Sequence, residues 1–166
     1  MRIFFSFLFP LLSIFLPLSA LRIPIELEVA LTKQQRAWGL MQRTYLPENQ
    51  GMIFYYSKSL WMFNTWIDLS AAFLDKRGVI LEIAELKSYP EMMDVNRPVN
   101  QLSDMRKYPP NDKVYLFFLQ KIKHYPRGAR YAIEMNKGWF AKHGVKPGDR
   151  VIWNLQSPQA YVELLN

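Results

Sequence analysis

Two carboxylates stand among apolar neighbours, Asp68 in the stretch WMFNTWIDL and Glu134 in the stretch YAIEM. A carboxylate in such surroundings must find a partner, or its pKa must shift. The candidate partners are Arg36 and Arg43, whose spacing puts them near one face of a helix. Two arrangements follow. One is a structural Arg–carboxylate network. The other is a ligand-binding or catalytic site, with Asp68 and Glu134 as the acid–base pair of a glycan hydrolase.

The stretch WMFNTWIDL mixes an amide, a hydroxyl and a carboxylate with aromatic side chains. If it forms one continuous strand, its side chains alternate between an apolar core face and a second face that is half polar. Trp66 on the second face would contact a sugar or a similar small molecule, and Asn64 and Asp68 would orient it. We expect this face either to line a ligand pocket or to tie down a covering loop; it consists of Met62, Asn64, Trp66, Asp68 and Ser70.

Other kinds of site are not indicated. The sequence has no cysteine, and its two histidines, His124 and His143, lack ligand-like spacing to carboxylates, so we expect no metal site. There is no glycine-rich phosphate loop and no G-x-S-x-G motif, and we expect no cofactor. His143 fits the C-terminal end of a short helix. Asp75 and Asp149 fall in turn sequences, where Asp commonly bonds to local backbone.

The composition suits a globular protein with one core. The chain has 166 residues, of which 50% are hydrophobic, and a formal net charge of +7. The basic residues are scattered, and the densest set, at positions 121–130, is expected to be a solvated face. We therefore expect no nucleic-acid partner, and an unknown small molecule or envelope component instead.

Residues 1–20, MRIFFSFLFPLLSIFLPLSA, differ from the rest of the chain. A basic start, a long apolar run and a Pro-Leu-Ser-Ala end are the layout of a secretory signal peptide. We expect cleavage after Ala20, a mature domain of residues 21–166, and export to the periplasm or the extracellular space. The alternative is an uncleaved leader that anchors the protein in a membrane, the only membrane contact expected.

The remaining patterns predict a mainly β fold, a compact sandwich or barrel-like single domain of seven or eight short strands with two short covering helices. Thr32 is expected to cap one helix and Asn136 the other, which Gly144 ends. Residues 89–110 are expected to form a long excursion with one short helical turn. Strands are expected at 22–31, 52–56, 61–75 (one bent strand or two paired segments), 79–86, 113–120, 129–135, 150–153 and 161–165, the last at a sheet edge.

Three blocks of the sequence resemble one known family, the domain of unknown function 192 family (uncharacterised ACR). They are RAWGLMQRTYLPENQGMIFYY, WMFNTWIDLSAAFLDKRGVI and YAIEMNKGWFAKHGVKPGDRV. The resemblance implies a small, mainly β, often secreted or periplasmic domain with no established activity. Where the family usually has Pro-Leu-Asp, this chain has Asp68-Leu69-Ser70, so an acid that served a shared chemistry is lost or relocated. The matching positions are Gly39, Leu40, Met41, Arg43, Gly51, Met52, Phe54, Trp61, Met62, Asn64, Thr65, Ile67, Phe73, Leu74, Glu134, Gly138, Gly148 and Asp149.

These observations favour an exported domain that binds a small ligand or an envelope partner without catalysis. The poverty of nucleophiles and metal ligands, together with the aromatic and amide groups of WMFNTWIDL, motivates this prediction. Two alternatives stay open: a structural or assembly protein without a ligand, and a carboxylate-based hydrolase. The candidate ligand-binding residues are Arg36, Arg43, Asn64, Trp66, Asp68 and Glu134.

Overall fold

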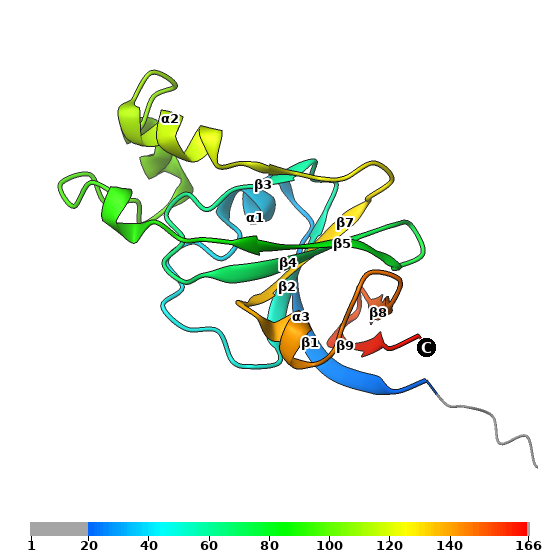
Figure 1. Ribbon diagram of the computed structural model, residues 1–166. Coiled ribbons are helices and arrows are strands. Elements are labelled where there is room, and N and C mark those ends of the chain that lie inside the picture. Colours follow the sequence, from blue (N-terminus) through cyan, green and yellow to red (C-terminus); the bar gives the residue numbers. More distant parts are fainter. Residues whose placement is uncertain (1–19, 166) are drawn as a thin grey trace, which may run out of the picture.

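The chain folds around one curled seven-stranded sheet (Figure 1). The computed structural model describes residues 20–165, and the expected mainly β fold is confirmed; the proposed leader, apart from Ala20, lies outside these residues. The strand order is β5-β4-β7-β2-β1-β9-β8, and β3 and β6 form a separate two-stranded sheet. The strands are β1 Arg22–Ala30, β2 Gln50–Tyr55, β3 Ser59–Leu60, β4 Leu69–Leu74, β5 Ile80–Leu86, β6 Lys123–His124, β7 Tyr131–Asn136, β8 Arg150–Asn154 and β9 Ser157–Glu163.

Strand β1 follows the alternation of its sequence. Ile25 and Leu27 are buried, while Glu26 and Glu28 between and after them are exposed. β1 pairs with β2 in parallel, and every other neighbouring pair in the large sheet is antiparallel. The parallel pair needs a crossover connection, which the first helix and the following loop supply.

The last strand is not at an edge, contrary to the prediction. β9 lies between β1 and β8, and the edges of the large sheet are β5 and β8. A tight turn after Asn154 folds β9 back on β8, and Val162 is fully buried. The sequence 161–165 covers only the end of β9, so its second partner was not visible in the pattern.

Helix α1, Lys33–Trp38, begins at the expected cap. The Thr32 hydroxyl accepts a hydrogen bond from the backbone N–H of Gln35 (3.1 Å), and the Gln35 side chain accepts one from the N–H of Thr32 (2.8 Å). The helix is shorter than expected because Gly39 takes a left-handed conformation, with φ +52°. A Cβ at Gly39 would lie 3.3 Å from the Phe54 ring, so the glycine also allows close packing.

The segment expected as a strand at 113–120 is instead helix α2, Lys113–Gln120. The Asp112 carboxylate caps it by accepting hydrogen bonds from the N–H groups of Val114 (2.8 Å) and Tyr115 (3.4 Å). The run KVYLFFLQ has apolar residues on every side, so periodicity does not separate helix from strand. With the 3-10 helices Pro90–Met92 and Leu102–Lys107, α2 forms a projection beside the sheet (Figure 1).

Helix α3, Trp139–Lys142, follows β7, but Asn136 does not cap it. The Asn136 side chain donates to the carbonyls of Leu46 (2.9 Å) and Pro47 (3.1 Å), and Gly138, with φ +73°, takes the cap position. The chain needs a left-handed residue there, which glycine provides most easily. His143 ends the helix as expected, with Nδ1 2.9 Å from the Trp139 carbonyl.

The two turn aspartates also bond to local backbone as expected. Asp75 accepts from the N–H groups of Arg77 (2.7 Å) and Val79 (2.9 Å). The fully buried Asp149 accepts from the N–H groups of Lys146 and Leu165, each at 2.8 Å. Both carboxylates therefore hold turns.

The core has parts on both faces of the sheet. One cluster joins β1, β7, β9 and α3, and a second joins β2, β4 and the loop after α1. A third, around Phe63, Tyr108 and Phe118, packs the projection against the rest of the fold. Among residues 20–165, no helix is both long and apolar enough to cross a membrane.

Candidate functional site

The stretch WMFNTWIDL is a loop, not a strand, up to Asp68. It connects β3 to β4, which begins at Leu69. Asn64 has φ +53°, and the N–H of Thr65 donates to the Met62 carbonyl at 3.2 Å, which closes a turn. Strand alternation therefore does not apply to residues 61–68. Consecutive residues Asn64 and Thr65 are both buried, while Trp66 is 49% exposed.

Trp66 lies on the wall of a surface cavity of about 420 Å³. This volume is in the range of small-molecule sites. We call the cavity the Trp66 pocket. It is lined by Gln42, Asn64, Trp66, Pro90, Met93, Asp94, Val95, Pro98, Val99 and Asn100.

Asn64 fixes the wall of the Trp66 pocket. Its Nδ2 donates to the Val99 carbonyl at 2.9 Å, and its Oδ1 accepts from the indole N–H of Trp66 at 3.3 Å. One buried amide therefore connects the indole to the loop that contains Val99. A side chain held in this way loses less freedom when a ligand binds.

Two non-glycine residues with left-handed backbone meet at the same pocket. Gln42 has φ +60° and Asn64 has φ +53°, and the N–H of Gln42 donates to the Asn64 carbonyl at 2.9 Å. The Gln42 side chain also donates to the Val99 carbonyl (2.6 Å) and to Asn100 (3.0 Å). Asn tolerates this conformation, whereas Gln adopts it at a cost. Such strain is concentrated at functional sites.

The charged group at the Trp66 pocket is already paired. Asp94 accepts from Arg97 at 2.8 Å, and Arg97 also bonds Asp112 at 2.5 Å. The hydrogen bond from Arg97 is the main cause that lowers the pKa of Asp94. The other polar side chains of the lining are amides, so the pocket offers hydrogen bonds without an unpaired charge.

Glu134 lies beside a different and much smaller cavity. It is on β7, is 4% exposed, and has neither a hydrogen bond nor an ion pair within residues 20–165. Burial raises the pKa of Glu134 to about 8. We call the adjoining space of about 30 Å³ the Glu134 cavity; its lining includes Arg36, Gly39, Met41, Phe54, Trp61 and Thr65.

The expected Arg–carboxylate network does not form. Arg36 donates to the Leu31 carbonyl, and Arg43 pairs with Glu28 at 2.7 Å. Arg36 lines the Glu134 cavity, whereas Arg43 lines neither the Glu134 cavity nor the Trp66 pocket. Arg36 lies in the last turn of the shortened α1, and Arg43 follows the helix. The two arginines therefore do not share the long helix face that the prediction assumed.

Asp68 is held at the surface by other partners. It accepts from Lys137 Nζ (2.9 Å) and from the Ser88 N–H (2.7 Å) and hydroxyl (2.9 Å). These bonds, led by the one from Lys137, lower the pKa of Asp68 to about 2. Asp68 lines neither the Trp66 pocket nor the Glu134 cavity, so the geometry gives no support for an acid–base pair of Asp68 and Glu134.

Ser70, where the family pattern has an acid, is fully buried. Its hydroxyl donates to Glu85 at 2.7 Å and accepts from the N–H of Gly138 at 2.7 Å. Ser70 thereby joins β4, β5 and the turn before α3. The position has a structural role in this chain.

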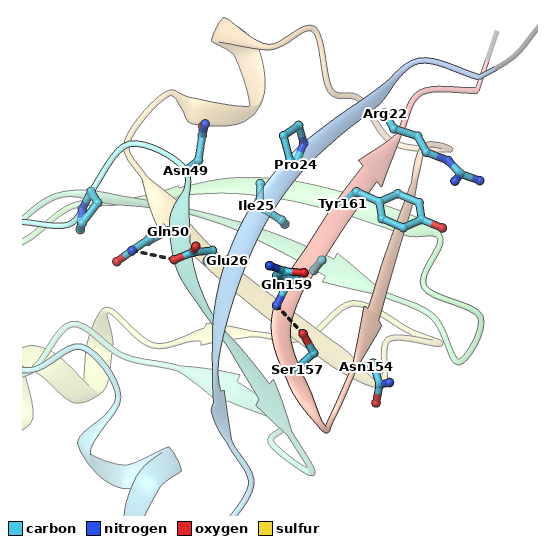
Figure 2. A pocket seen from close by; sticks show the side chains of 12 residues that line it. Arg22, Pro24, Ile25, Glu26, Asn49, Gln50, Asn154, Ser157, Gln159 and Tyr161 are labelled. Atoms are coloured by element: carbon cyan, nitrogen blue, oxygen red, sulfur yellow. Dashed lines mark hydrogen bonds between the residues drawn. The ribbon is translucent and has the colours of Figure 1, made fainter.

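A larger cavity, about 880 Å³, lies elsewhere and contains none of the candidate site residues. It is an open groove along β1 and β9 beside the start of β2 (Figure 2). Within it the Gln50 amide donates to Glu26 at 2.8 Å, and Arg22, which pairs with Glu163, lies over the Tyr161 ring. Arg22 therefore has an ion-pair partner, and Glu26 has a neutral hydrogen-bond donor.

Sequence reasoning missed part of the Trp66 pocket. Gln42, Met93 and Val99 line it, and nothing in their local sequence marks them. The long excursion after Tyr89 was visible as an irregular segment, and such segments carry function more often than regular ones. Among the described residues, no group of three or more His, Cys, Asp or Glu side chains is arranged to hold a metal ion.

Two solved structures are similar to this chain. A proposed transcription regulator from Sinorhizobium meliloti 1021 matches with a TM-score of 0.54 and 22% identity, over 80% of this chain and 93% of that chain. A protein of unknown function from Novosphingobium aromaticivorans DSM 12444 matches with a TM-score of 0.54 and 26% identity, over 78% and 75%. At this identity the first likeness shows the fold alone.

A family model described as uncharacterised ACR, domain of unknown function 192, matches residues 18–153. No curated protein matches the chain. The matched range contains both the Trp66 pocket and the Glu134 cavity.

Proposed function

The chain belongs to the domain of unknown function 192 family, and we propose that it is an exported protein whose Trp66 pocket binds a small uncharged molecule. The observation that carries the proposal is the half-exposed indole of Trp66, held by the buried amide of Asn64 at the wall of a cavity of about 420 Å³. An aromatic face with a few placed polar groups is typical of small-molecule sites.

The chemistry of the lining favours a hydroxyl-bearing ligand such as a sugar unit. The indole of Trp66 supplies a flat apolar surface, and the amides of Gln42 and Asn100 supply hydrogen-bonding groups near it. Asp94 is already paired with Arg97, which it shares with Asp112, so the lining offers no charged side chain that lacks a partner. A neutral polar molecule matches this combination better than a nucleotide or a charged peptide.

A structural role without a ligand is the alternative that a specific observation favours. Asn64 and Asp68 both satisfy backbone groups, at Val99 and Ser88. These bonds would be needed even if no ligand ever bound.

A thermal-shift screen distinguishes the two, because a ligand that binds the native state raises its apparent stability. We expect neutral mono- or disaccharides to raise the melting temperature of the protein, while nucleotides and charged peptides do not. Trp66→Ala should lose this response and Tyr45→Ala, at a surface residue that is 71% exposed, should keep it. If no sugar stabilises the protein, or if Trp66→Ala responds like the wild type, the ligand proposal fails and the structural role stands.

Export has its own test. We expect the mass of the protein recovered from outside the cytoplasm to correspond to a chain that begins at Leu21. A chain that still begins at Met1 would support the membrane-anchored alternative.

A further inference from the structure

Helix α2 is apolar on the side that faces solvent as well as on the side that faces the core. Its inner side packs into the third core cluster, where Phe118 is fully buried. The helical repeat puts Leu116 and Leu119 on the opposite side, and they are 40% and 45% exposed. A surface helix usually carries polar residues there. The centre of the outer side is therefore apolar and uncovered within residues 20–165.

A single exposed leucine is common on a protein surface, so the surroundings of these two decide their meaning. Leu116 and Leu119 are three positions apart on one helix and are therefore neighbours. The other exposed side chains of α2 are Lys113 and Gln120. We call these four residues the α2 face. An apolar centre with a polar border is the pattern of an interaction surface.

The stretch formed by α2 and the loop after it carries only positive charge. Residues 113–130 contain five Lys or Arg residues and no Asp or Glu. Lys123 pairs with Glu82, whereas the other four are exposed and make no ion pair within residues 20–165. We call these four the unpaired cations; they are Lys113, Lys121, Arg127 and Arg130.

The unpaired cations border the α2 face and continue beyond it. Lys113 begins α2, and Lys121 follows its last residue. The ammonium group of Lys121 lies 5.6 Å from the centre of the Phe117 ring, so a positive charge stands directly beside the apolar part of the helix. In Figure 1 the chain continues from α2 along the upper side of the molecule to the turn before β7. A broad partner that contacts α2 would therefore meet positive charge next to apolar side chains.

We propose that the α2 face binds the surface of a membrane that contains anionic lipids. Leu116 and Leu119 would enter the boundary between the headgroups and the acyl chains, while the unpaired cations lie among the lipid phosphates. Opposite charge selects this partner, because each Lys or Arg near an anionic surface adds attraction. The contact involves neither the leader nor the Trp66 pocket.

Two other partners fit less well. In a two-fold dimer the same surface lies on both sides of the interface, so the unpaired cations of two copies would face each other and repel. An acidic protein would match the charge. A stable protein interface, however, needs about 20–30 residues on each side, more than the α2 face and the unpaired cations provide. A membrane needs only a few apolar side chains together with charge.

Co-sedimentation with lipid vesicles tests the proposal. The protein is the chain of residues 21–166, which keeps every described strand and helix and excludes the leader from the measurement. We expect it to bind vesicles of equal parts phosphatidylglycerol and phosphatidylcholine, and not to bind vesicles of phosphatidylcholine alone. Added salt should weaken the binding, because it screens the charges.

Substitutions at the leucines test the apolar part of the contact. Leu116→Ser combined with Leu119→Ser should weaken binding to the anionic vesicles by about tenfold, because less apolar surface leaves water. The matched control is Leu155→Ser, at a leucine that is 53% exposed in the turn between β8 and β9. It should bind like the wild type. Unchanged melting temperatures would show that the leucine variants are folded.

Substitutions at the lysines test the charged part. Lys113→Gln combined with Lys121→Gln should weaken binding by about thirtyfold, because two charges leave the membrane contact. Lys33→Gln combined with Lys76→Gln removes the same charge at exposed positions outside residues 113–130 and should change the binding little.

Several results would overturn the proposal. They are equal binding to both kinds of vesicle, binding to neither, and losses that are as large in the control variants. Binding that needs the lysines but not the leucines would show adsorption of a basic protein without insertion, and it would overturn the proposal as well. Trp66→Ala should bind the vesicles like the wild type, so failure of the Trp66 pocket as a ligand site leaves this result unchanged.

Discussion

Glu134→Gln should change the pH dependence of stability more than any other single substitution in this protein. The carboxyl of Glu134 is buried and unpaired, and its pKa is raised from 4.5 to about 8. The native state therefore holds a proton that the unfolded state releases above about pH 4.5. A neutral amide of the same shape removes this difference.

The sign and size follow from that proton. Below 4.5 the carboxyl is protonated in both states and costs nothing extra. As the pH rises from there to about 8, the wild type loses about 1.4 kcal/mol of unfolding free energy per pH unit through this group. At pH 7 the loss amounts to about 3 kcal/mol, and above the native pKa it levels off near about 5 kcal/mol.

Urea unfolding at a series of pH values measures the effect. The difference between Glu134→Gln and the wild type cancels the contributions of the other titrating groups. We expect the two proteins to be about equally stable near pH 4.5 and the variant to be more stable at pH 8. Glu91→Gln, at an exposed carboxylate, should parallel the wild type throughout. Parallel curves for Glu134→Gln and the wild type would refute the inference that Glu134 is buried without a partner.

Substitutions at three further positions test other interactions in the structure. Asn64→Ala should destabilise the protein by about 2 kcal/mol, and Asn64→Gly by about 1 kcal/mol less. Both variants lose the hydrogen bonds to Val99 and Trp66, but only glycine relieves the left-handed backbone. Equal losses of unfolding free energy in chemical denaturation would argue against backbone strain at this position. Asp68→Asn should lower the free energy of unfolding by about 1 kcal/mol at pH 7, a value discounted for the partial exposure of the carboxylate, and should have no effect near pH 2. The reason is that the lowered pKa stabilises the fold only where Asp68 is ionised. A loss of stability that does not depend on pH would contradict the role of its charge. Asp112→Ala should lower the melting temperature and the helix signal in circular dichroism. Asp112→Asn can still cap α2 and should retain most of the melting temperature and of the helix signal. Equal losses in the two variants would show that the cap is unimportant.

The sequence predicted those elements whose signals are local. β1 was recognisable because Ile25 and Leu27 alternate with glutamates, and α1 because Thr32 is an N-cap residue before a helical stretch. α2 was not recognisable, because a run such as KVYLFFLQ is apolar on every side and its helical form is set by the Asp112 cap and by packing around Phe118. Tertiary context decided between two structures that the local pattern allowed.

The candidate site was predictable only in part, for a related reason. Glu134 was identified because it is a carboxylate among apolar neighbours, and Trp66 because it is an aromatic residue close to Asn64 and Asp68. The groups that contact them come from segments distant in the sequence. Strand alternation gave the wrong faces for residues 61–68, since the left-handed Asn64 turns the chain. Gln42 and Val99 meet Asn64 through backbone geometry that no residue pattern announces.

The central claim is that Trp66 marks a binding pocket for a small uncharged molecule. The most direct measurement follows the indole N–H signals of the protein by two-dimensional nuclear magnetic resonance during titration with neutral mono- and disaccharides. The Trp66 signal, assigned by its loss in Trp66→Phe, should shift in a saturable way because its N–H bonds Asn64 at the pocket wall. The signal of the buried Trp139, whose N–H bonds Asn49, should stay in place. A Trp66 signal that no neutral sugar moves, or that moves only together with Trp139, would contradict the claim.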